Sequence, residues 1–266
     1  MGGNLDMTLF VANSEAVKLY IENNTSDSER SWDAGVAVPS GETQPSGVAI
    51  KADGDILLTG FTLDRLYTYD VSASSWDTGI ALPSGATAPT GLAVKGNGDI
   101  VLVDDATDEF YTYDASASSW DGGVGLFIVP NQNPRGVAVK NNGDVVVLNA
   151  GSQQGMYTYD VSASSWDSGV AYPSGVTDPR GITINDDGDI FIVDSATAQF
   201  YTYDVSASRW DSGAGISLPT GVIQPSGLAL KANGDIVIVD RATDRLYTYS
   251  AVSDLNVYLA NEQLWP

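Results

Sequence analysis

The sequence repeats itself with a period of 44 to 46 residues, and this repetition restricts the possible fold more than any other feature. The segment YTYDVSASSWD at 67–77 returns almost unchanged at 111–121, 157–167 and 201–211. Two sets of markers keep the period: five tryptophans (Trp32, Trp76, Trp120, Trp166, Trp210) and five Gly-Asp pairs ending at Asp55, Asp99, Asp144, Asp189 and Asp235. Two independent markers with one period indicate tandem structural repeats.

Each repeat carries four strand signals in succession. In the copy that starts at Gly91, the first apolar segment ends at a two-residue turn, Asn97-Gly98, whose type favours a β-hairpin. A second apolar segment (99–104), a segment with alternating aromatics (109–114) and a strand that starts at the tryptophan follow it. No part of the copy has the periodicity of a helix.

The second strand of each copy predicts how the copies pack. Its residues are apolar at successive positions, as in 99–104 and 235–240, and do not alternate. A continuous apolar strand is covered on both faces. A four-stranded antiparallel sheet that is buried on both faces and repeated every 44 to 46 residues is typical of a β-propeller blade. The five tryptophans are then structural anchors between blades, although stacking on a ligand is the alternative.

The number of blades follows from a sixth, partial copy. Residues 8–23 match 235–250 position by position, and residues 257–260 resemble a closing strand. We therefore expect one domain over 1–266, an all-β, six-bladed β-propeller of four-stranded antiparallel blades, closed by pairing of the N- and C-terminal strands. The expected blades are about 1–46, 47–90, 91–135, 136–180, 181–226 and 227–266.

Residues 225–250, PSGLALKANGDIVIVDRATDRLYTYS, resemble the NHL-type propeller repeat. The resemblance covers about half of each unit in five copies and implies the architecture without a particular activity. Lyases of this group use histidine and a metal, whereas this chain has no His. Gluconolactonase-like propellers bind a divalent cation in the central channel and carry a Glu in a Gly-Glu-Gly-Pro-like segment, which this chain lacks.

Composition excludes several classes of function. The chain has no Cys and no His, so disulfides, thiolate chemistry and histidine-based zinc sites are excluded. Its net charge of −22 disfavours binding to nucleic acid or to an anionic membrane. No apolar run reaches the length of a membrane-spanning helix, and no signal peptide is visible, so we expect a soluble protein of unspecified compartment.

Register places two sets of residues at one mouth of the expected channel. One set stands directly before the glycine of each first strand and consists of Ser46, Thr90, Arg135, Arg180 and Ser226. The other set consists of the last residues of the second strands: Asn13, Gly60, Asp104, Asn149, Asp194 and Asp240. The candidate ligand-binding residues are Arg135, Arg180, Asp104, Asn149, Asp194 and Asp240. The arginines could clamp a carboxylate or phosphate, and Asp104, Asp194 and Asp240 suit Ca²⁺. Alternatively, these Asp side chains cap their own Asp-x-Ala-Thr loops.

Three functions remain open. We favour a non-enzymatic binding or scaffold propeller with no catalytic residues, because the polar residues recur copy by copy while catalysis needs distinct roles. The alternatives are a divalent-metal-dependent hydrolase or lactonase, and a sugar-binding, lectin-like propeller that uses aromatic pairs such as Tyr111 and Tyr113. No cofactor is required, although Ca²⁺ is possible. We expect a monomer whose partner is a protein, a small molecule or a glycan. The third copy is irregular at 127–133 and 151–155.

Overall fold

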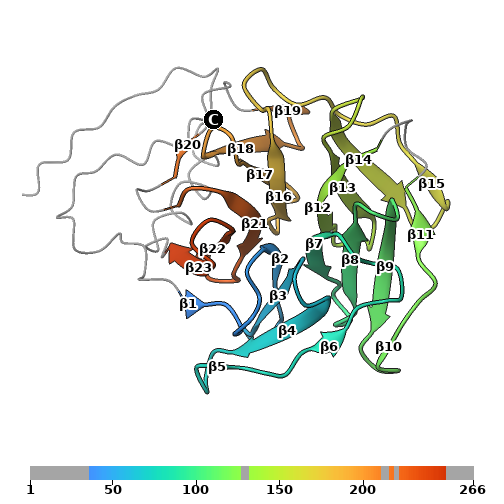
Figure 1. Cartoon of the computed structure of the whole chain (residues 1–266). Helices are drawn as coiled ribbons and strands as arrows, with labels where there is room; N and C mark the ends of the chain where they lie inside the picture. The colour runs from blue at the N-terminus through green and yellow to red at the C-terminus, as the bar shows by residue number, and fades with distance from the viewer. Residues whose placement is uncertain (1–35, 127–131, 211–215, 219–221, 250–266) are drawn as a thin grey trace, which may run out of the picture.

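A computed structural model describes residues 36–126, 132–210, 216–218 and 222–249, and these residues form a five-bladed β-propeller (Figure 1). Each blade is an antiparallel sheet whose strands follow the chain outward from the axis. The five innermost strands are β2 (Pro45–Ile50), β7 (Pro89–Val94), β12 (Pro134–Val139), β16 (Pro179–Ile184) and β21 (Pro225–Leu230). The described residues contain no helix, and hence none that could cross a membrane.

The remaining strands lie progressively further out. The second strands are β3 (Ile56–Gly60), β8 (Ile100–Asp104), β13 (Val145–Asn149), β17 (Ile190–Asp194) and β22 (Ile236–Asp240). The third strands are β4 (Arg65–Asp70), β9 (Glu109–Asp114), β14 (Gly155–Asp160), β18 (Gln199–Asp204) and β23 (Arg245–Tyr249). Short outer strands carry the tryptophans: β5 (Ser75–Trp76), β10 (Ser119–Trp120), β15 (Ser165–Trp166) and β19 (Arg209–Trp210).

A further two-residue strand pairs with the third strand in four of the five blades. In three blades it follows in the same repeat: β6 (Ile80–Ala81), β11 (Val124–Gly125) and β20 (Ile216–Ser217) pair with β4, β9 and β18. In the third blade a single bridge, Met156 with Val170, takes this position. In the fifth blade the position is filled from the other end of the described chain, by β1 (Val36–Ala37) against β23.

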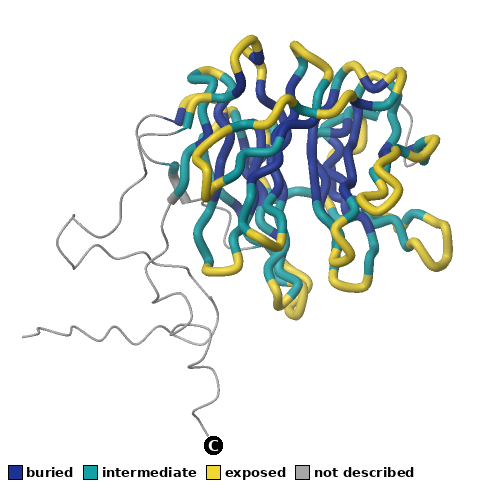
Figure 2. The backbone as a smooth tube through the Cα atoms, turned by 90° about the horizontal axis from the view of Figure 1, so that it is seen from below, coloured by how far each residue is buried: buried dark blue, intermediate teal, exposed yellow. Residues whose placement is uncertain are grey.

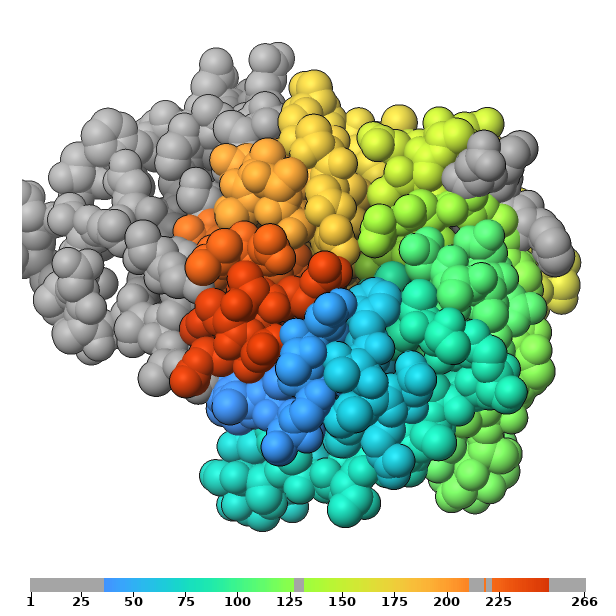
Figure 3. Space-filling model, in the orientation of Figure 1, coloured from blue at the N-terminus to red at the C-terminus, as the bar shows by residue number. Residues whose placement is uncertain are grey.

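The prediction of six blades is wrong. The innermost strand β21 packs directly against β2, so five blades close the ring. Figure 3 shows the first blade (blue) in contact with the fifth (red). The expected sixth blade and its closure depended on residues 8–23 and 257–260, which lie outside the described residues. Within the described part of the chain, β1 completes the last sheet.

The core consists of apolar clusters between neighbouring blades. Leu57 and Leu66 of the first blade, for example, pack against Leu92 and Leu102 of the second. Equivalent clusters occupy the other four junctions. The second strands are buried over nearly their whole length because they are covered on both faces, and exposed residues concentrate in the loops at either end (Figure 2). Burial of apolar surface between blades is therefore what holds the ring together.

The tryptophans lie at the outer edge of these junctions. Trp120 packs against the cluster between the first and second blades, and its Nε1 donates to the carbonyl oxygen of Ala81 at 2.9 Å. Trp76 and Trp210 make the same bond to the preceding blade, at Ala37 and Ala171. Each ring also lies 5.1–5.2 Å from a tyrosine of its own blade, as Trp166 does from Tyr159. Trp32 lies outside the described residues.

Ring closure gives a first testable prediction. Ser226 Oγ in the fifth blade donates to the carbonyl oxygen of Pro45 in the first blade at 2.7 Å, and both residues are buried. Ser226→Ala should lower the free energy of unfolding by about 1 kcal/mol, because Pro45 loses a buried donor. The control is Ser46→Ala, whose hydroxyl donates within its own blade to Thr59 at 3.3 Å. Urea denaturation measures both, and equal losses would contradict a special contribution of Ser226 at the closing junction.

Candidate functional site: the axial mouth

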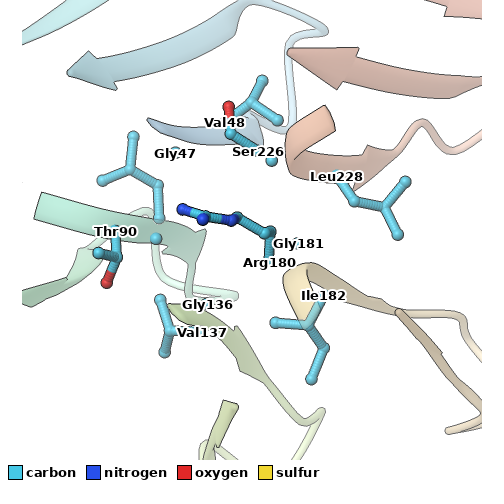
Figure 4. Close-up of a pocket in the computed structure, with 13 residues that line it drawn as sticks. Gly47, Val48, Thr90, Gly136, Val137, Arg180, Gly181, Ile182, Ser226 and Leu228 are labelled. Atoms are coloured by element: carbon cyan, nitrogen blue, oxygen red, sulfur yellow. The ribbon is translucent and has the colours of Figure 1, made fainter. Parts of the chain in front are cut away.

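The five innermost strands meet at the propeller axis through their glycines. The Pro-x-Gly segment of each strand contains a register shift between Pro and Gly. The glycines approach the next blade so closely that a side chain would overlap it: a Cβ on Gly91 would lie 2.7 Å from Gly136 Cα. The remaining axial cavity measures about 10 Å³, and it is lined by these glycines and by apolar residues such as Val137 and Ile182 (Figure 4).

Above this constriction, residues at the x position of Pro-x-Gly gather at one mouth. They line a second small cavity of about 10 Å³ together with Phe61 and Arg241: Ser46, Thr90, Arg135, Arg180 and Ser226. The hydroxyls in this set serve the scaffold, since Thr90 Oγ1 donates to the carbonyl oxygen of Pro134 in the next blade at 2.8 Å. The second and fifth blades are thus tied to their neighbours, while the third and fourth blades present arginines at this position.

Arg180 extends across the axis. Its side chain points from the fourth blade toward the blades that carry Thr90 and Gly47 (Figure 4). Its Nε and Nη2 both bond one carboxylate oxygen of Asp178, at 3.0 and 2.9 Å. The ion pair is therefore formed with the residue before the proline, and not with Asp104, Asp194 or Asp240. Arg180 lines both cavities, so its guanidinium covers the axial constriction.

Two further guanidinium groups are less well compensated. Burial lowers the pKa of Arg135, and the positive charge of Arg180 lowers it further. Arg135 Nε is buried and has no hydrogen-bond partner among the described residues. Burial and then the charge of Arg180 also lower the pKa of Arg241, whose guanidinium carbon lies 5.8 Å from the centre of the Phe61 ring. Three cations thus share one mouth in a chain of net charge −22.

The acidic residues predicted to face this mouth are buried beneath it. Asp104 is fully buried: one carboxylate oxygen accepts from Ala88 N at 2.8 Å, and the other from the amides of Ala106 and Thr107 and from Thr107 Oγ1. Asp194 and Asp240 hold the equivalent loops of their blades. Each accepts from two amides of the preceding loop, and Asp194 accepts from a single amide of the following loop. The carboxylates therefore fasten two loops of their own blade, which is the loop-capping alternative.

Asn149 replaces the aspartate in the third blade and keeps part of this arrangement. Its Oδ1 accepts from the amides of Asn133 and Gly151, and its Nδ2 donates to the carbonyl oxygen of Gln153 at 2.8 Å. Asn13 lies outside the described residues. Among the residues with described positions, no group of three or more Asp or Glu side chains is arranged to hold a metal ion.

The first blade has a glycine, Gly60, where the others have Asp or Asn, and Glu42 supplies the missing carboxylate. Glu42 is 3 % exposed, and its oxygens accept from the amides of Gln44, Thr62 and Leu63. These amides lie one repeat before those that Asp104 holds. A Cβ on Gly60 would lie 2.5 Å from the Glu42 carboxyl, so only glycine leaves room for it. Sequence reasoning missed this exchange, although Glu42 stands in a column that is apolar in three of the other four copies (Ala86, Val176, Val222).

Sequence reasoning also missed four residues of the mouth. Phe61, Asp105 and Arg241 follow the last residue of their second strands, and Asp178 precedes the proline of β16. The residues at the equivalent positions of the other copies differ in chemistry, so the repeat alone did not single out these four positions. Burial raises the pKa of Asp105 despite the opposing attraction of Arg135. The charged residues at the mouth are therefore Arg135, Arg180, Arg241, Asp105 and Asp178.

The aromatic pairs proposed for sugar binding divide into two environments. Tyr111 and Tyr201 are buried between blades, at 4 % and 1 % exposure, while Tyr113 and Tyr203 are half-buried and lie against the tryptophans. The hydroxyl of Tyr111 donates to Glu109 Oε2 at 2.6 Å. One ring of each of these pairs therefore belongs to the core.

No protein-family model and no curated protein matches the chain. Solved structures do: a catalytically inactive virginiamycin B lyase from Staphylococcus aureus with quinupristin has a TM-score of 0.54 at 14 % identity, over 85 % of this chain and 87 % of that one. A gluconolactonase from Xanthomonas campestris has a TM-score of 0.54 at 13 % identity, over 78 % and 76 %. The calcium-binding protein regucalcin from Agrobacterium tumefaciens has a TM-score of 0.51 at 15 % identity, over 77 % and 70 %.

This chain is a β-propeller. At identities of 13–15 %, the likeness shows the fold alone. The NHL-like resemblance of the repeat is accordingly a statement about architecture, and the activity has to be argued from the mouth itself.

Proposed function

We propose that the chain is a ligand-binding propeller that takes a small anionic group at the axial mouth through Arg135, Arg180 and Arg241. The observation that carries the proposal is the buried Nε of Arg135, which has no partner among the described residues although it lies in a charged pocket. Several buried polar atoms lack a partner among the described residues, but of these only Arg135 Nε lies in the pocket with two further guanidinium groups, and this combination supports binding of an anionic group there. Arginine suits carboxylates and phosphates because its donors match their oxygens.

Ligand-induced stabilisation tests the proposal. An anion that binds the folded chain stabilises it by RT ln(1 + c/Kd), where c is the free anion concentration, so the melting temperature rises with the logarithm of that concentration above the dissociation constant. We expect acetate, at constant ionic strength, to raise the melting temperature of the intact protein, and sulfate or inorganic phosphate to do so at higher concentration. Arg135→Ala should remove most of this increase, because it deletes the unsatisfied donor. The matched control is Arg209→Ala. Arg209 is exposed on the outer strand β19, away from the mouth, so this variant should keep the increase. Equal responses of the two variants would refute the site.

The metal-dependent hydrolase or lactonase is the second candidate. The structural likeness to a gluconolactonase and to the calcium-binding protein regucalcin favours it, and binding of Ca²⁺ by this chain would agree with that likeness. Against it, the oxygens of Asp104, Asp194 and Asp240 are directed at loop amides. Titration with Ca²⁺, Mg²⁺, Mn²⁺ and Zn²⁺, monitored by melting temperature, separates the two functions. A saturable shift with any of these cations, lost on Asp194→Asn, would favour the metal-dependent alternative.

A further inference from the structure

We infer that the axial mouth selects a monoanionic carboxylate and discriminates against dianions such as sulfate and hydrogen phosphate, and that Asp105 and Asp178 are the residues responsible. This inference rests on the proposed function, since it names the class of ligand that the same site takes. It depends on three properties of the mouth: its charge, its remaining donors and its size.

The charge at the mouth is nearly balanced. The three arginines face Asp178, which holds Arg180 at 2.9 Å, and Asp105, whose charge reaches both Arg135 and Arg180. One net positive charge is left at the rim. The carboxylates of Asp104, Asp194 and Asp240 are fully buried, and each accepts at least four hydrogen bonds from its own loops, which compensate its charge there. The net positive charge at the mouth therefore compensates one ligand charge, whereas a second would be repelled by Asp105 and Asp178 at low local dielectric.

The available donors suit a planar group with two oxygens. Two donors of Arg180, Nε and Nη2, are already bonded to Asp178. Arg135 Nε is buried and has no partner among the residues described. Arginine donors lie in one plane and bind a carboxylate through parallel bonds, while a tetrahedral anion needs donors from several directions. Because Arg180 is held by Asp178, fewer of its donors are left for a tetrahedral anion.

The size of the mouth also limits the ligand. The space between the arginines, Phe61 and the hydroxyls of the first-strand residues measures about 10 Å³, and the glycine constriction lies directly below. A space of this size holds about one water-sized group. One ligand oxygen fits this space, so the rest of the anion lies at the outer side of the mouth, where the second charge of sulfate or hydrogen phosphate would be repelled by Asp105 and Asp178.

Competition between anion classes tests the inference on the intact protein. Dissociation constants for acetate, propionate, sulfate and inorganic phosphate are measured by calorimetry at pH 8, where phosphate is mainly a dianion, and at fixed ionic strength. We expect the two carboxylates to bind at least about 10-fold more tightly than sulfate and phosphate. Asp105→Asn and Asp178→Asn should each strengthen sulfate and phosphate binding by about 10-fold and change acetate binding less.

The outcomes separate this inference from the proposed function. If sulfate or phosphate binds the unmodified protein as tightly as acetate, and Arg135→Ala still abolishes binding, the carboxylate class is wrong while the anion site stands. If no anion binds, both are wrong. If neither Asp variant changes the preference, the discrimination does not come from these residues and the inference fails. Asp178→Asn releases Arg180 from its ion pair, so Asp105→Asn, which leaves that pair intact, is the decisive variant.

Discussion

Gly136→Ala should lower the free energy of unfolding by about 3 kcal/mol, because a single added methyl group would overlap the backbone of the neighbouring blade. A Cβ at this position would lie 2.5 Å from the carbonyl oxygen of Arg180 and 3.2 Å from Ile182. Both belong to the fourth blade, so relief requires the third and fourth blades to separate. Since the core lies between blades, separation also loosens the cluster around Leu148 and Ile182.

The matched control is Gly96→Ala. Gly96 lies within the hairpin turn of the second blade, has no neighbouring atom within 4 Å of an added Cβ and does not adopt a left-handed conformation. Its replacement should change the free energy of unfolding by less than about 0.5 kcal/mol. Urea denaturation of both variants gives the comparison. A loss below about 1 kcal/mol for Gly136→Ala would mean that the blades do not meet as closely as the geometry of the axis implies.

The same effect should appear at the mouth. Gly136 adjoins Arg135, and the carbonyl it would contact belongs to Arg180. Any Gly136→Ala protein that remains folded should therefore bind acetate more weakly, because the two guanidinium groups are displaced from one another. This response connects the constriction to the binding site, and Gly96→Ala should leave acetate binding unchanged.

The repeat predicted the architecture because periodicity and burial are local properties of the sequence. The uninterrupted apolar segments, such as 99–104, needed cover on both faces, and a ring of blades provides it. The number of blades could not be predicted in the same way. The match between 8–23 and 235–250 shows that both segments are suited to the second and third strands of a blade. It does not show that the ring contains a separate blade for each of them. In the structure, β1 pairs with β23. These strands lie at opposite ends of the described chain, so the pairing depends on closure of the ring and not on local sequence.

The site was only partly predictable, for a related reason. Register placed Arg135 and Arg180 side by side at one mouth, and the structure has both in one pocket. Arg241 and Phe61 come from loops whose chemistry differs in every copy, so no column marked them. The aspartates were ambiguous, because an Asp at the end of a strand can face a ligand or its own loop. The hydrogen bonds of Asp194 to Asp178 N and Thr197 N decide between these in the structure, and no sequence pattern does.

The exchange of Glu42 and Gly60 provides the second large effect. Glu42→Val gives the first blade the residue that Val176 and Val222 provide in the fourth and fifth blades, but it leaves three loop amides without an acceptor. We expect a loss of about 3 kcal/mol, because buried amides that lose a charged partner each carry a desolvation cost. Gly60→Asp should cost at least as much, because its carboxylate would overlap that of Glu42 and bury a second like charge.

The double variant Glu42→Val with Gly60→Asp should recover most of this loss. It recreates the arrangement in which Asp194 holds the same loops in the fourth blade, below Val176. The carbonyl oxygen of Gln44 lies 2.7 Å from a Cβ on Gly60 and has to move slightly, so recovery should be incomplete by about 1 kcal/mol. A coupling energy of more than about 2 kcal/mol between the two substitutions, measured by urea denaturation, is the expected result. Additive losses would show instead that the Glu42 carboxylate does not occupy the position taken by the aspartates of the other blades.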